Sequence, residues 1–133
     1  MRFVCLCYYD HAQYEACSPA DLEAVGRICA PRDEQLRASG RVILNSSLGE
    51  PSRARTLRAG KDGEATVSDG PYAQTKEPLG AMFLIEAADL DDAVRIARLH
   101  PGSVLGKYFG GGIEVRAFDH FVLSSPQPAP IGA

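Results

Sequence analysis

The residues with the clearest chemical potential surround an Asp-Gly-Pro-Tyr turn in the middle of the chain. Asp69 begins this turn, Gly70 and Pro71 shape it, and Tyr72 completes it. An Asp in a turn typically accepts hydrogen bonds from nearby backbone amides, and this structural role competes with a role as general base or charge anchor. Asp69 is therefore a candidate catalytic residue, and Tyr72 is a candidate substrate-binding residue that serves as a pocket wall or weak acid.

Three further charged residues are candidates for ligand binding. Lys76 and Glu77 follow the turn, where they either hold and orient an anionic substrate group or form a solvated pair on a surface loop. Arg116 lies in a predicted strand, on the face that carries Glu114. An unpaired buried guanidinium costs several kcal/mol, so Arg116 requires an anionic ligand or a carboxylate partner, either Glu114 or Glu86.

Two histidines have positions that suggest a role. His11 follows the first predicted strand beside Tyr8, at the mouth of a pocket in many open-sheet folds. It is a candidate proton shuttle, with an exposed loop histidine as the alternative, and Tyr8 is a candidate substrate-binding residue. His100 ends the second predicted helix, where the helix dipole favours a cationic ring. His120 receives no role.

The cysteines do not form a metal or disulfide pattern. Cys5 and Cys7 share one face of a predicted strand, about 6.6 Å apart along its axis, and no CxxC pair occurs. We expect reduced, mostly buried cysteines, with a redox or metal role as the alternative, and we assign no metal and no cofactor.

Composition limits the class of protein. The 133 residues suffice for one domain, predicted over residues 1–123, followed by a flexible Pro-rich tail over residues 124–133. Fourteen Lys and Arg against seventeen Asp and Glu give a net charge of −3, which argues against nucleic-acid binding. No apolar run approaches the roughly 20 residues that span a bilayer, and no signal-peptide pattern is present, so we expect a cytoplasmic protein.

The hydrophobic pattern predicts the order β-α-β, a hairpin, and β-α-β. The predicted strands cover residues 2–9, 41–48, 80–87 and 113–118, and the hairpin strands cover 54–58 and 64–67. A Ser18-Pro19 start predicts one helix up to Ser39-Gly40, with Pro31 expected to kink or split it. An Asp89 cap predicts the second helix, and residues 10–17 are expected to form a connection. This order indicates an α+β, ferredoxin-like split βαβ fold with an antiparallel sheet and an extra β-hairpin.

Two of the predicted strands are apolar on both faces, around residues 3–8 and 82–85. Two helices cover only one face of a sheet, and the other face would expose more apolar surface than monomers usually tolerate. We therefore predict a homodimer in which the sheet of a second copy packs on this face, giving a dimeric α/β barrel.

The segment from Val67 to Gly80, VSDGPYAQTKEPLG, resembles the signature of the YCII-related family, in particular its DGPF branch. Further agreement comes from the stretches FLIE at 83–86, DLDDA at 89–93 and GIEVR at 112–116, whereas Tyr72 stands where the branch has Phe and Gln74 where Glu is common. The resemblance implies a ferredoxin-like dimeric fold. The fold relatives of this family include isomerases, dehydrochlorinases and monooxygenases that act without a metal. Other DGPF proteins are encoded beside sigma-factor genes or are fused to sigma factors.

Two functions remain open on this basis. The first is a small cofactor-independent lyase or isomerase acting on an oxygenated small molecule, in which Asp69 or His11 removes a proton and Arg116 or Lys76 stabilises the oxyanion. The second is a non-catalytic small-molecule-binding or accessory module linked to transcriptional regulation. The first requires Asp69 or His11 to lie within hydrogen-bond reach of another ionisable group in a concave site.

Overall fold

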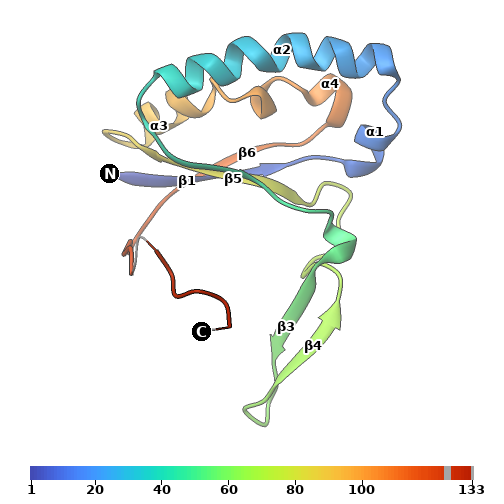
Figure 1. Cartoon of the computed structure of the whole chain (residues 1–133), viewed down its shortest axis with the longest axis vertical. Helices are drawn as coiled ribbons and strands as arrows, with labels where there is room; N and C mark the ends of the chain where they lie inside the picture. Colours follow the sequence, from blue (N-terminus) through green and yellow to red (C-terminus); the bar gives the residue numbers. More distant parts are fainter. Residues whose placement is uncertain (125–126, 133) are drawn as a thin grey trace.

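The computed structural model describes residues 1–124 and 127–132 (Figure 1). Its strands are β1 (Arg2–Tyr8), β2 (Val42–Ser47), β3 (Arg55–Ala59), β4 (Ala65–Asp69), β5 (Leu79–Glu86) and β6 (Gly112–Ala117). Its α-helices are α1 (His11–Glu15), α2 (Pro19–Ala38), α3 (Leu90–Ala97) and α4 (Gly106–Phe109), with 3-10 turns η1 (Pro51–Arg53) and η2 (Pro101–Ser103). The predicted flexible tail falls partly outside the described residues, and its flexibility stays a prediction.

The main sheet has four strands in the order β2-β5-β1-β6, and every neighbouring pair is antiparallel. The first strand of the chain therefore lies inside the sheet, between the strands that flank α3 in sequence. This arrangement agrees with the predicted ferredoxin-like α+β fold, and the predicted strand boundaries hold within about two residues. No helix in the described part of the chain has the length and apolar character needed to cross a membrane.

The hydrophobic core lies between the sheet and the helices, all of which cover the same face (Figure 1). Alternate residues of β1 and β5 point into it, because side chains of a strand alternate between its two faces. The fully enclosed members include Phe3, Cys5, Leu36, Phe83, Ile85 and Ile96. The buried Cys5 and Cys7 are free thiols, as are the partly buried Cys17 and Cys29.

The opposite face of the sheet is apolar along β1 and β5 and has no helix over it. Cross-strand neighbours on it are Val4 with Leu84 and Leu6 with Met82. Leu44 of β2 lies beside Leu84. We call this surface the open face; toward β6 it also carries Glu114 and Arg116. The sequence-based expectation of strands that are apolar on both sides is thus confirmed, whereas the covering partner stays a prediction.

Helix α2 runs unbroken through Pro31, so of the two predicted outcomes the split is wrong, and the kink stays a prediction. A proline inside a helix removes the hydrogen bond to the carbonyl four residues earlier, here that of Arg27. Both Pro31 and Arg27 are exposed, so water can satisfy the freed carbonyl. The expected capping box is present: the Ser18 hydroxyl accepts from the Asp21 amide at 3.1 Å, and Asp21 accepts from the Ser18 amide at 3.2 Å.

Two short helices were not predicted. The expected connection over residues 10–17 contains α1, whose start is capped by Asp10 through bonds from the amides of Ala12 and Gln13. Helix α4 precedes a turn in which Gly110 and Gly111 both have positive φ. Helices of four or five residues lack a hydrophobic period, so only their caps signal them in a sequence.

Replacing Ser18 tests the role of the capping box. We expect Ser18→Ala to lower the free energy of unfolding by about 1 kcal/mol, because the Asp21 amide loses its partner at the exposed start of α2. Urea denaturation followed by circular dichroism measures the change. Ser52→Ala is the matched control, since the Ser52 side chain has no hydrogen bond among the described residues, and an equal loss in both variants contradicts the capping role.

Candidate functional site

The Asp-Gly-Pro-Tyr turn lies at the foot of the β3–β4 hairpin. Gly70 has a φ of +98°, and its carbonyl accepts a 2.8 Å bond from the buried Thr56 hydroxyl. Its amide donates to the Ala54 carbonyl at 2.8 Å, so backbone and Thr56 hold the turn. The Asp69 side chain is 93% exposed and lies 3.6 Å from Arg55 Nε. Asp69 therefore faces solvent beside a cation and lines neither of the two cavities described below.

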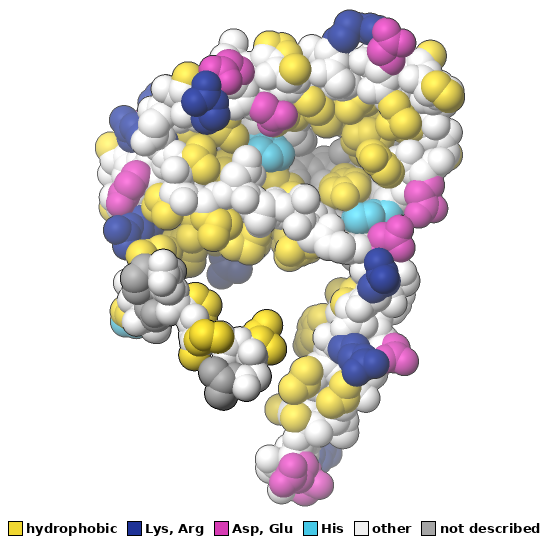
Figure 2. Space-filling model, in the orientation of Figure 1, with side chains coloured by type: hydrophobic (Ala, Val, Ile, Leu, Met, Phe, Trp, Pro, Cys, Tyr) yellow, Lys and Arg dark blue, Asp and Glu magenta, His cyan; other side chains and the backbone are white. Residues whose placement is uncertain are grey.

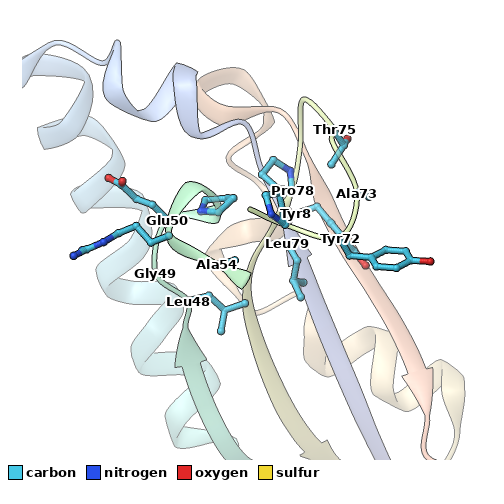
Figure 3. A pocket seen from close by; sticks show the side chains of 13 residues that line it. Tyr8, Leu48, Gly49, Glu50, Ala54, Tyr72, Ala73, Thr75, Pro78 and Leu79 are labelled. Carbon is cyan, nitrogen blue, oxygen red and sulfur yellow. The ribbon is translucent and has the colours of Figure 1, made fainter. Parts of the chain in front are cut away.

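A groove of about 670 Å³ opens beside this turn (Figure 3). We call it the hairpin-foot groove; it is lined mainly by apolar residues, among them Tyr8, Leu48, Pro71, Tyr72, Pro78 and Leu79. Figure 3 shows the Tyr72 ring directed away from the other lining side chains. This ring is 71% exposed and carries the Arg58 guanidinium 4.5 Å from its centroid. The structure thus brings Tyr8 and Tyr72 to one groove, with Tyr72 at its outer wall.

Tyr8 also begins a polar row on the open face. Its hydroxyl donates to Glu114 Oε1 at 3.4 Å, and Arg116 Nε lies 3.7 Å from Glu114 Oε2. Burial, the negative charge of Glu114 and this hydrogen bond raise the pKa of Tyr8, so its phenol stays protonated. Of the two alternatives for Arg116, the structure contains the ion pair, and Glu114 is the partner.

Lys76 and Glu77 contact different parts of the fold. Lys76 Nζ lies 4.0 Å from Asp10 Oδ2, and Glu77 accepts a hydrogen bond from the Gly111 amide. Glu77 thereby ties the loop before β5 to the turn before β6. Both residues have protein partners, and their predicted role in ligand binding stays a prediction.

His11 packs flat on Tyr9, with ring centroids 4.2 Å apart. Its Nε2 is enclosed and has no hydrogen-bond partner among the described residues. His11 and Asp69 line neither the hairpin-foot groove nor the cavity described next, and neither makes a hydrogen bond to another ionisable side chain among the described residues. Their catalytic role stays a prediction.

A second cavity, of about 310 Å³, lies between α2 and the sheet. We call it the His100 cavity; residues from β1, α2, η2 and α4 line it, including Cys7, Tyr14, Cys29, Asp33, His100 and Phe109. Figure 2 shows hydrophobic side chains gathered around a hollow below α2. The hollow exists because α2 buries only Leu36, near its end, while Val25, Ile28 and Cys29 reach the sheet side without being enclosed.

His100 is the most constrained polar side chain of this cavity. Its ring stacks on Phe83 with centroids 4.6 Å apart and planes 5° from parallel. Its Nδ1 accepts a 2.9 Å bond from the Gly102 amide, which places the proton of the neutral ring on Nε2. Nε2 has no partner among the described residues and is available as a hydrogen-bond donor, and His100 lines both this cavity and a shallower one beside Asn45 and Ser46.

The prediction of a cationic His100 that caps the second helix is wrong. Burial lowers the pKa of His100, an effect that outweighs the opposing influence of Asp33. The ring instead caps η2, which begins directly after it. The dipole argument failed because η2 begins directly after His100 and its Gly102 amide donates to Nδ1, while partial burial of the ring disfavours its charged form.

The thiols of the His100 cavity are also uncharged. Burial raises the pKa of Cys7 to about 11. Burial and the charge of Asp33 raise the pKa of Cys29. A thiol is nucleophilic and binds metals as its thiolate, so these cysteines act as apolar wall. In the described part of the chain no three His, Cys, Asp or Glu side chains meet as a metal site.

The sequence did not lead us to predict the His100 cavity. Cys29 and Asp33 are four residues apart and therefore share a helix face, which is a visible signal. The His100-Pro101-Gly102 sequence is another, because a side-chain acceptor before a proline can cap a short turn. Neither signal indicates that β1 and α4 complete the cavity.

Comparison with known proteins places these features in a family. Residues 1–113 match the YCII-related domain, and the match includes every residue that lines the two cavities. An uncharacterised protein of Rhizobium meliloti (strain 1021) is 36% identical over 98 residues, which cover 74% of this chain and 78% of that protein.

The partly buried His100, whose pKa is lowered by burial, predicts a pH-dependent stability. Between its lowered folded-state pKa and its ordinary value of about 6.5, the unfolded chain binds a proton that the folded chain excludes. The contribution of the neutral His100 to the free energy of unfolding is therefore complete above about pH 6.5. It is lost as the pH falls toward the folded-state pKa. We expect His100→Asn, which keeps an acceptor for Gly102, to flatten the acid side of the stability profile in urea titrations. The exposed His120→Asn leaves the slope unchanged, and an equally steep slope in both variants refutes the assignment.

Proposed function

Because this chain belongs to the YCII-related family and contains a largely apolar cavity under α2, we propose that it binds a small oxygenated organic molecule there. The His100 cavity contains two protonated thiols, a neutral imidazole and aromatic walls. Ligand sites are typically apolar with a few precisely placed polar groups, and this cavity has that composition. Its low polarity favours an uncharged ring compound over a carboxylate.

The observation that carries this proposal is the fixed donor at His100. The Gly102 amide occupies Nδ1, and Phe83 holds the plane of the ring. Nε2–H is then preorganised for a carbonyl or ether oxygen, because no side-chain rearrangement is needed to present it. A ligand that supplies an acceptor satisfies a donor which otherwise has no protein partner.

Cofactor-independent isomerisation or elimination is the second candidate function. Asp33 lines the same cavity as His100. A carboxylate that removes a proton beside a carbonyl, with Nε2–H stabilising the oxygen that becomes negative, is sufficient for such chemistry. Exchange of ligand α-protons for deuterium in heavy water, followed by NMR, separates this function from simple binding. Coupling of ligand binding to transcriptional regulation, which the family resemblance implies, stays a prediction.

The proposal includes a homodimer closed across the open face. Val4, Leu6 and Met82 are only partly buried there although they lie in the middle of a sheet. A second sheet packed on them removes this apolar surface from water, and a two-fold axis uses the same surface on both copies. The polar row of Glu114 and Arg116 then lies along one side of the interface, already paired.

Ligand binding is tested with uncharged lactones and cyclohexenones, with benzoate as the charged comparison. We expect the neutral compounds to raise the melting temperature and to shift amide NMR signals of β1 and η2. His100→Asn weakens their binding three- to tenfold, the equivalent of one hydrogen bond, and His120→Asn does not. If benzoate alone stabilises the protein and Arg116→Ala abolishes the effect, the ligand site is on the open face instead.

The dimer is tested by placing a charge on the open face. We expect wild-type protein to show twice the 14.3 kDa chain mass in light scattering, and Leu6→Arg to show the single mass while keeping its circular dichroism spectrum. Leu22→Arg, at an exposed position near the start of α2 and away from the open face, is the control that leaves the mass unchanged. A wild-type protein that stays a single copy at micromolar concentration excludes the dimer.

A further inference from the structure

The β3–β4 hairpin is a two-stranded ribbon without a core of its own. Its strands pair only with each other, and its foot is fastened by Thr56 and by the bond from Arg58 to the Tyr72 carbonyl. Figure 1 shows the ribbon standing out from the body on the side of the sheet that the helices leave free. Isolated two-stranded hairpins are marginally stable in water, so a ribbon of this kind requires a surface to pack on.

The ribbon carries its own apolar contact surface. Leu57 and Val67 are directly opposite each other in the hairpin register, and they are 67% and 62% exposed. The next pair, Ala59 with Ala65, lies on the same face. In Figure 2 the hydrophobic side chains of the ribbon gather on the flank turned toward the space below the sheet.

The open face alone is small for a stable interface. Strands lie about 4.8 Å apart and rise about 3.4 Å per residue, so four strands of about six residues cover a projected area of roughly 400 Å², before the relief of their side chains is counted. Stable interfaces bury about 800 Å² per partner. A second copy seated on the sheet therefore needs further contact surface, and the ribbon offers it on the same side of the molecule.

We infer that the β3–β4 hairpin is an arm that reaches across to a second copy of this chain and buries Leu57 and Val67 against it. This inference rests on the dimer proposed above and adds the arm to its interface. The hairpin-foot groove shares Tyr8 with the open face, so the second copy also closes this groove. The charged tip of the arm, with Lys61, Asp62 and Glu64, remains in water.

The contact is tested directly by photo-crosslinking in the full chain. A benzophenone amino acid placed at position 57 is expected to give a covalent dimer on denaturing gels, whereas the same group at position 22 on α2 is not. Mass spectrometry of the product must identify two copies of this chain. Crosslinks from position 57 only within one chain, including to residues 118–124, show that the arm packs on its own subunit and overturn the inference.

The energetic role is tested by the double substitution Leu57→Thr and Val67→Thr, which keeps strand-forming residues but removes the apolar pair. We expect the dimer dissociation constant from sedimentation equilibrium to rise at least tenfold. Leu22→Thr with Val104→Thr, two exposed apolar residues away from the arm, leaves it unchanged. An unchanged constant in the arm variant refutes the arm while the dimer stands, and a wild-type monomer refutes both.

Discussion

The constraint on which this structure depends is a four-stranded sheet with apolar side chains on both faces and helices on only one. β1 and β5 impose it, because they are the two inner strands and their alternation fills both sides. On the helix side, Phe3, Phe83 and Ile85 form a closed core. On the other side, the same strands present a surface that a single copy leaves in contact with water. The fold is therefore complete on one face and open to association on the other.

The helices do not pack tightly on the whole of their side of the sheet, and the His100 cavity lies where they leave space. The partial burial of its lining residues determines their protonation. α2 is anchored where Leu36 enters the core, while its first half stands above β1 and α4. Burial there disfavours the charged forms of two lining residues: the pKa of Cys7 rises and that of His100 falls. The lining is largely apolar and its acidic residue is Asp33, which is why the proposed ligand is an uncharged oxygenated molecule and not an anion.

Strand order, the hairpin and both long helices could be predicted from the sequence because each has a period and a cap. The candidate site could be predicted only in part. Tyr8 and Tyr72 do meet in one groove, but His100, Cys29 and Asp33 were missed as a group. Periodicity reports which face a residue occupies within its own element, whereas a cavity depends on how far two elements stand apart. His100 shows this most clearly, since its charge was inferred from its helix and is decided by Phe83 and the turn that enclose it.

The two surfaces are connected through one strand. Cys7 and its neighbour Tyr8 both line the His100 cavity, and Tyr8 also lines the hairpin-foot groove. A slip of one residue in a strand exchanges its faces, so the register of β1 decides the composition of both sites. The pairing of β1 with β5 shifts between these two residues, and such bulges re-aim side chains beside functional sites. Cys7 and Tyr8 share a peptide bond at this irregularity, so the cavity under α2 and the hairpin-foot groove have one short piece of backbone in common.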